Sequence, residues 1–114
     1  MKTIIAGSRT ITDYEVVKQA IIESEFQITE VVSGAARGVD RLGERWAQEN
    51  GVPVKRFPAD WKAYPKFAGI KRNAEMGNYA EALIAIWDGR SRGTENMIKI
   101  SEPKGLKVFV VTVG

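Results

Sequence analysis

The chain has 114 residues, 44% of them hydrophobic, and its 17 basic against 14 acidic side chains give a net charge of +3. We expect a single domain over residues 1–114, and the small charge excess argues against a duplex nucleic-acid partner. With no cysteine and no histidine, disulfides, thiol chemistry and the commonest zinc ligand and general base are excluded. We therefore expect a cytoplasmic protein without metal or cofactor and, because no apolar run approaches about 20 residues, without membrane contact.

Five short apolar runs alternate with helical patterns along the chain. We expect strands at residues 3–6, 31–33, 54–57, 82–87 and 107–113. The first helix is expected to begin near Asp13, because Thr12 and Glu15 have capping-box spacing. The second carries Val39, Leu42 and Trp46 on one face, with a C-cap at Gly51. Two further helices are expected over residues 70–79 and from about 94 to 100.

Strands that alternate with helices predict βαβ units, a parallel sheet and right-handed crossovers. We therefore expect a three-layer α/β sandwich with five parallel strands in the order 3-2-1-4-5. The fourth run, residues 82–87, is the most continuous apolar stretch and is typical of a fully buried central strand. Trp46 and Trp87 are expected in the core.

Three loops at one edge of this sheet share an unusual composition. The loops "GSRT", "SGAARGVD" and "DGRSRGT", which follow the first, second and fourth strands, each combine glycine, a hydroxyl residue and arginine. In such sheets ligands bind at the carboxyl ends of the strands, where the strand order reverses. Helix N-termini attract anions, and glycine lets a phosphate approach the backbone. Each glycine can equally serve a tight turn alone, and each arginine can simply be solvated.

The caps of the two later loops differ. Residues 34–38 offer no side chain to cap the helix that follows, so a phosphate, water or Ser33 must satisfy its free N–H groups. In the last loop, Ser91 or Thr94 can cap the helix internally, in competition with a phosphate. Asp40 lies in the first turn of its helix, where it favours the helix dipole or positions a ligand hydroxyl.

Two further segments carry polar and aromatic side chains. "FPADWKAYPKFAG" (residues 57–69) interleaves aromatic residues with lysine, so it can stack on a base or pack as a hydrophobic loop. "IKRNAEM" (residues 70–76) places Arg72 and Asn73 at an expected helix start. This pair can bind a phosphate and a ribose or base edge, or Asn73 can be an N-cap and Arg72 merely exposed.

These patterns predict a set of ligand-binding residues at the carboxyl edge of the sheet. The backbone cradle is expected from Gly34, Gly38, Gly89, Gly93 and Thr94. Side-chain contacts are expected from Ser8, Arg9, Arg37, Arg72, Asn73 and Asp88, whereas Arg90 and Arg92 can face solvent.

The segments "VVSGAARGVDRLGERWAQENGVPVKRFPADW", "RNAEM" and "ALIAIWDGRSRGTENMI", with "GSR" at residues 7–9, resemble the YspA-like branch of the SLOG superfamily. The resemblance covers nearly the whole chain. It implies a Rossmann-like domain that binds or senses a nucleotide or nucleotide-derived ligand, with assembly into homo-oligomers as an option. Relatives include the Lonely Guy phosphoribohydrolases and DprA, which binds single-stranded DNA.

The enzymatic relatives share a P-G-G-x-G-T-x-x-E signature whose Glu assists cleavage of an N-glycosidic bond. This chain keeps Gly93 and Thr94, but Met97 occupies the position of the Glu, and Glu95 lies two residues earlier, on another side of the helix. The resemblance therefore favours binding over hydrolysis of a nucleoside monophosphate. If hydrolysis occurs, Glu75, Asp60 and Asp88 are the candidate catalytic carboxylates. A single-stranded nucleic-acid binder is a second alternative.

Overall fold

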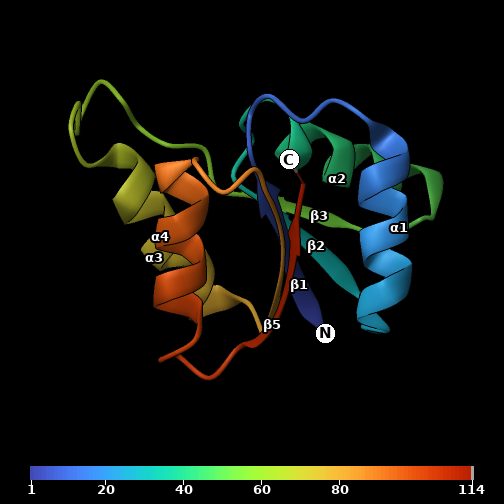
Figure 1. Cartoon of the computed structure of the whole chain (residues 1–114). Coiled ribbons are helices and arrows are strands. Elements are labelled where there is room, and N and C mark those ends of the chain that lie inside the picture. Colours follow the sequence, from blue (N-terminus) through green and yellow to red (C-terminus); the bar gives the residue numbers. More distant parts are fainter. Residues whose placement is uncertain (114) are drawn as a thin grey trace.

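The computed structural model of the chain describes residues 1–113 and is shown in Figure 1. Within these residues the strands are β1 (Lys2–Gly7), β2 (Glu30–Ser33), β3 (Val54–Arg56), β4 (Ala82–Trp87) and β5 (Lys107–Thr112). The helices are α1 (Tyr14–Ser24), α2 (Val39–Glu49), α3 (Ala68–Tyr79) and α4 (Arg92–Ser101). The α/β alternation therefore follows the expected order of elements.

The five strands form one parallel sheet in the order β3-β2-β1-β4-β5, which confirms the predicted architecture. Helices α1 and α2 cover one face of the sheet, and α3 and α4 cover the other (Figure 1). The strand order reverses between β1 and β4, whose paired residues run from Thr3 opposite Ala82 to Gly7 opposite Ile86. The carboxyl ends of these two strands therefore lie side by side.

Successive side chains of the central strands point to opposite faces of the sheet, so the core is divided into two layers. In β4, Ile84 and Ile86 pack with α1 and α2, whereas Leu83 and Ala85 pack with α3 and α4. Residues 82–86 are all fully buried, as the continuous apolar run predicts. The edge strand β3 is exposed along its whole length. The core therefore lies on both faces of β1 and β4, directly beneath the reversal of strand order.

Several local details differ from the sequence expectations. Asp13, not Thr12, caps α1, because its Oδ1 accepts a hydrogen bond from the amide of Glu15 at 3.0 Å. Helices α3 and α4 each begin two residues earlier than expected. Trp46 is half-buried against the core, but Trp87 lies outside both core layers, where its Nε1 donates to the carbonyl of Ser91 at 3.0 Å. The prediction that Trp87 is a core residue was wrong, because this residue ends its strand.

Candidate functional site

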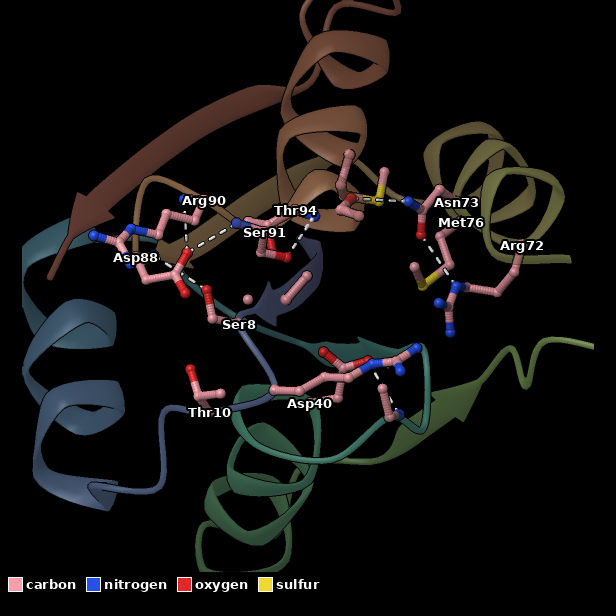
Figure 2. Close-up of a pocket in the computed structure, with 16 residues that line it drawn as sticks. Ser8, Thr10, Asp40, Arg72, Asn73, Met76, Asp88, Arg90, Ser91 and Thr94 are labelled. Atoms are coloured by element: carbon pink, nitrogen blue, oxygen red, sulfur yellow. Dashed lines mark hydrogen bonds between the residues drawn. The ribbon is translucent and has the colours of Figure 1, made fainter. Parts of the chain in front are cut away.

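A cavity of about 400 Å³ opens at the carboxyl ends of β1 and β4. Figure 2 shows side chains from several elements placed around one common space. The cavity is lined by Ala6, Gly7, Ser8, Arg9, Thr10, Ala36, Asp40, Arg72, Asn73, Met76, Asp88, Arg90, Ser91, Gly93, Thr94 and Met97. This is the place at which a parallel sheet with reversed strand order binds its ligands.

Ser8 connects the three loops that the sequence singled out. Its amide donates to the carbonyl of Ile86 at 3.1 Å, and its Oγ accepts a hydrogen bond from the amide of Asp88 at 3.1 Å. Its carbonyl accepts from the amides of Ile11 at 3.3 Å and Val39 at 3.5 Å. With an exposed fraction of 1%, the Ser8 side chain is a structural link between loops. It also forms part of the cavity wall.

The loop between β4 and α4 is capped by its own side chains. Asp88 Oδ1 accepts hydrogen bonds from the amides of Arg90 at 2.8 Å and Ser91 at 2.9 Å, and these bonds lower the pKa of Asp88. Ser91 Oγ accepts from the amide of Thr94 at 3.3 Å and lies 3.0 Å from Thr94 Oγ1. Internal capping is therefore the arrangement in this structure, although Gly93 and Thr94 still line the cavity.

The loop between β2 and α2 has no side-chain cap at its helix. Gly38 is the N-cap residue, and no side chain accepts from the first turn of α2. The amides just before it are satisfied, since Ala35 donates to Ser33 Oγ at 3.0 Å and Ala36 donates to Asp40 Oδ2 at 3.2 Å. The expected uncapped helix is present, and its loop is held by Ser33 and Asp40.

Contacts within the chain crowd both Gly34 and Gly38, and at Gly38 the crowding atoms belong to the backbone. A Cβ on Gly34 would lie 2.5 Å from Nη1 of Arg72 and 2.7 Å from Oδ2 of Asp40. A Cβ on Gly38, whose φ is +74°, would lie 2.5 Å from the carbonyl oxygen of Ser8. Since the chain itself fills the space beside both glycines, neither lines the main cavity.

Arg72 and Asn73 occupy one wall of the cavity from helix α3. Arg72 Nη1 donates to the carbonyl of Gly34 at 2.5 Å, and Arg72 Nε donates to Asn73 Oδ1 at 3.0 Å. Burial lowers the pKa of Arg72, and the charge of Arg9 lowers it further, against the opposing effect of Asp40. Asn73 Nδ2 donates to the carbonyl of Gly93 at 3.1 Å. This bond connects α3 to α4. Asn73 lies inside α3, whose N-cap residue is Phe67, so the N-cap interpretation of Asn73 was wrong.

Asp40 is the most perturbed carboxyl of the cavity wall. Its side chain is only 5% exposed, and burial raises its pKa to about 6. The Ala36 amide and the charge of Arg72 act in the opposite direction, and Glu44 adds to the rise. A carboxyl with a pKa near 6 can hold or release a proton close to neutral pH. The sequence placed Asp40 near the site but gave no sign of its burial.

The remaining predicted residues separate into two groups. Ser8, Arg9, Arg72, Asn73, Asp88, Gly93 and Thr94 line the main cavity, whereas Gly34, Arg37, Gly38 and Gly89 do not. Two candidate carboxylates also lie elsewhere: Asp60 is exposed and accepts from the amide of Ala63, and exposed Glu75 pairs with Lys71 at 3.3 Å. Among the cavity residues that sequence reasoning missed, Met76 is fully buried and Thr10 is exposed.

Metal-ligating clusters and membrane-spanning helices are both absent from the described residues. In residues 1–113 no three His, Cys, Asp or Glu side chains come close enough together to ligate a metal ion. No helix in that part of the chain has the length and apolarity required to cross a membrane. The polar residues that line the cavity are three arginines, two aspartates, one asparagine, two serines and two threonines.

The fold and the site define an α/β protein with a Rossmann-like sheet and a polar cavity at its switch point. The chain belongs to the YspA, cpYpsA-related SLOG family, whose model YAcAr matches residues 1–64. The Gene 61 protein of Mycobacterium phage D29 is 34% identical over 118 residues, covering 95% of this chain and 94% of that protein. The resemblance seen in the sequence is thus confirmed, and the family supports a function related to nucleotides or nucleic acids.

A solved structure shares the same fold. The X-ray structure of DNA processing protein A (DprA) from Streptococcus pneumoniae matches with a TM-score of 0.80 at 20% sequence identity. The match covers 99% of this chain but 50% of the DprA chain, so the present chain corresponds to half of that protein. At this identity the likeness concerns the fold.

Proposed function

We propose that the main cavity binds a nucleotide or a nucleotide-derived phosphate ligand. The observation that carries the proposal is the gathering of three arginines and two aspartates around one space of about 400 Å³. The arginines are Arg9, Arg72 and Arg90, and the aspartates are Asp40 and Asp88. The volume is within the range of about 300–1,000 Å³ that is usual for small-molecule sites.

The two kinds of charged group suit different parts of such a ligand. Arginine binds phosphate oxygens through paired N–H groups, and the first turn of α4, at Arg92 and Gly93, adds backbone amides and a favourable dipole. Carboxylates accept hydrogen bonds from ribose hydroxyls, and Asp40 and Asp88 are available for that role. In this proposal the phosphate lies among Arg9, Arg72 and the first turn of α4, and the ribose faces a carboxyl of the main cavity.

Isothermal titration with AMP, GMP and inorganic phosphate tests this proposal directly. A nucleotide at 100 times its Kd adds about 2.7 kcal/mol to stability, so a thermal-shift assay gives an independent reading. We expect Arg72→Gln to weaken nucleotide binding by about tenfold, because a charged hydrogen bond is lost. Arg45→Gln is the matched control, since Arg45 is exposed on α2 and pairs with Glu49 outside the cavity. Failure of every nucleotide to bind would contradict the proposal.

Asp40 supports a second candidate function, hydrolysis of an N-glycosidic bond. In that reaction the bond from C1′ to the base nitrogen breaks, a water oxygen bonds to C1′, and the proton released by water ends on the departing base. A carboxyl with a pKa of about 6 can carry this proton, whereas Met97, at the position of the signature Glu, only contributes to the cavity wall. Release of free base from AMP or GMP that disappears in Asp40→Asn would support hydrolysis.

A further inference from the structure

A second cavity of about 330 Å³ adjoins the main one. The two share Arg9, Ala36 and Arg72, so these residues form a common wall. The second cavity is lined in addition by Gly34, Ala35, Arg37, Arg41, Pro58, Ala59 and Trp61. Four of its lining residues are arginines, and none of the described residues that line it is acidic. It therefore differs in charge from the main cavity, which contains two carboxyls.

Three of the four arginines of the second cavity form no salt bridge with a carboxylate of the described residues, whereas the fourth, Arg72, interacts with the charge of Asp40. In residues 1–113, the salt bridges involve other cations, such as Arg45 with Glu49 at 3.0 Å and Arg56 with Glu44 at 2.5 Å. Arg9, Arg37 and Arg41 are exposed and have no such pair within the described chain. Uncompensated guanidinium groups repel one another, so their gathering around one cavity favours an anionic ligand.

Trp61 gives the second cavity an aromatic wall. Its side chain is 50% exposed, although tryptophan is usually highly buried. The surrounding turn is fixed by Asp60, whose Oδ1 accepts from the amide of Ala63 at 3.1 Å. The indole also lies near the first turn of α3, since a Cβ on Gly69 would be 3.5 Å from its Cη2. The segment between β3 and α3 projects beyond α3 (Figure 1). An exposed indole held in this way is a stacking surface for a base.

We propose that the two cavities hold one ligand, a dinucleotide whose two nucleosides are joined through phosphate groups. This inference rests on the proposed function, because the first nucleoside occupies the main cavity. The linking phosphates lie at the shared wall, beside Arg9 and Arg72, and the second base stacks on Trp61. The carboxyls of the main cavity lie beside a ribose, and the arginines of the second cavity, which has no acidic lining residue, lie beside the phosphates.

The floor of the main cavity favours a dinucleotide over a longer single strand. The main cavity is bounded by Ala6, Met76 and Met97, whose exposed fractions are 7%, 1% and 1%. A polynucleotide requires a groove that continues past each nucleotide, whereas a buried floor suits a ligand that ends there. From this buried floor the site opens past Arg72 toward Trp61, where the second cavity and a further cavity of about 290 Å³ both lie.

Isothermal titration of the full chain with AMP and diadenosine diphosphate tests the inference, with GMP and diguanosine diphosphate as the guanine pair. We expect one dinucleotide to bind at least about tenfold more tightly than its mononucleotide. Trp61→Ala should weaken the dinucleotide by at least about fivefold and leave the mononucleotide unchanged. Tyr64→Ala is the matched control, because Tyr64 is 44% exposed in the same segment but lines neither cavity.

A second pair of variants tests the charges. Arg41→Gln should weaken the dinucleotide alone, and Arg45→Gln, on the same helix and outside both cavities, should leave it unchanged. Equal affinities for mononucleotide and dinucleotide in the unaltered protein would overturn the inference while the proposed function stands. The inference would also be overturned if a ten-nucleotide oligothymidine bound more tightly than any dinucleotide and its binding depended on Trp61. Absence of binding by AMP, GMP and both dinucleotides would instead overturn the proposed function.

Discussion

Replacement of Asp40 by asparagine should change how the stability of the protein depends on pH. The Asp40 carboxyl is 5% exposed and lines the main cavity, and burial is the largest cause of its raised pKa. Arg72 opposes the rise and Glu44 adds to it. Asparagine keeps the shape of the side chain and an oxygen that can accept from the Ala36 amide, but it does not ionise.

The sign and the size of the effect follow from the two pKa values. The Asp40 carboxyl ionises at a pKa of about 6 in the folded chain, against an ordinary value of 3.8. Between these values the folded chain binds more protons than the unfolded chain, so its stability falls as pH rises and is level above about pH 7. Two pKa units correspond to about 3 kcal/mol. Relative to the unaltered protein, Asp40→Asn should therefore gain about 2.4 kcal/mol between pH 4 and pH 7, because the carboxyl of the unfolded chain is already more than half ionised at pH 4.

Urea unfolding at constant ionic strength, at half-unit steps from pH 4 to pH 8, measures this difference. The quantity of interest is the free energy of unfolding of Asp40→Asn minus that of the unaltered protein. Asp60→Asn serves as the reference, since Asp60 is exposed and outside the main cavity. A difference that stays constant over the whole pH range would refute the reasoning, because it would mean that the pKa of Asp40 is not raised in the folded protein.

Three further predictions concern the turns and the core. Gly38→Ala should lower the free energy of unfolding by at least about 2 kcal/mol more than Gly51→Ala does. Both glycines have positive φ, but only at Gly38 would a Cβ meet a backbone carbonyl oxygen, at 2.5 Å. Equal losses in urea unfolding would contradict the contact. Ser91→Ala should cost about 1 kcal/mol by removing the cap on the Thr94 amide, and an unchanged urea midpoint would show that the cap is dispensable. Ser101→Ala should leave stability unchanged or raise it by up to about 1 kcal/mol, because the buried Ser101 hydroxyl has no partner within residues 1–113; a clear loss would show that the hydroxyl is satisfied.

The sheet could be predicted from sequence because its signals are local or follow from general rules of connection. The unbroken apolar run at residues 82–87 indicates a central strand, and the α/β alternation then requires parallel pairing. Helix boundaries were less predictable where two adjacent residues are equally suited to the same capping position. Thr12 and Asp13 are both good N-cap residues, and only the backbone path decides that Asp13 accepts from Glu15.

The candidate site was predictable in position and only partly in its residues. Loop composition located the carboxyl edge, since the ends of parallel strands meet there whatever the side chains are. The composition does not say what fills the space beside a glycine, and at Gly34 the chain itself supplies Arg72 and Asp40. Nor does it give burial, so the exposed Glu75 was named as a candidate acid and the buried Asp40 was not.

The hydrogen bonds of Ser8 constrain how this site can change during evolution. One residue is bonded to the strand end at Ile86, to the β4–α4 loop at Asp88 and to the start of α2 at Val39. A change in the length of any one of these loops would displace Ser8 and strain its hydrogen bonds to the other two. Insertions and deletions near the cavity therefore destabilise all three loops together. Ligand preference within this architecture therefore diverges most readily by exchange of exposed side chains that line the cavity, such as Arg9 and Arg90, with the loop lengths kept fixed.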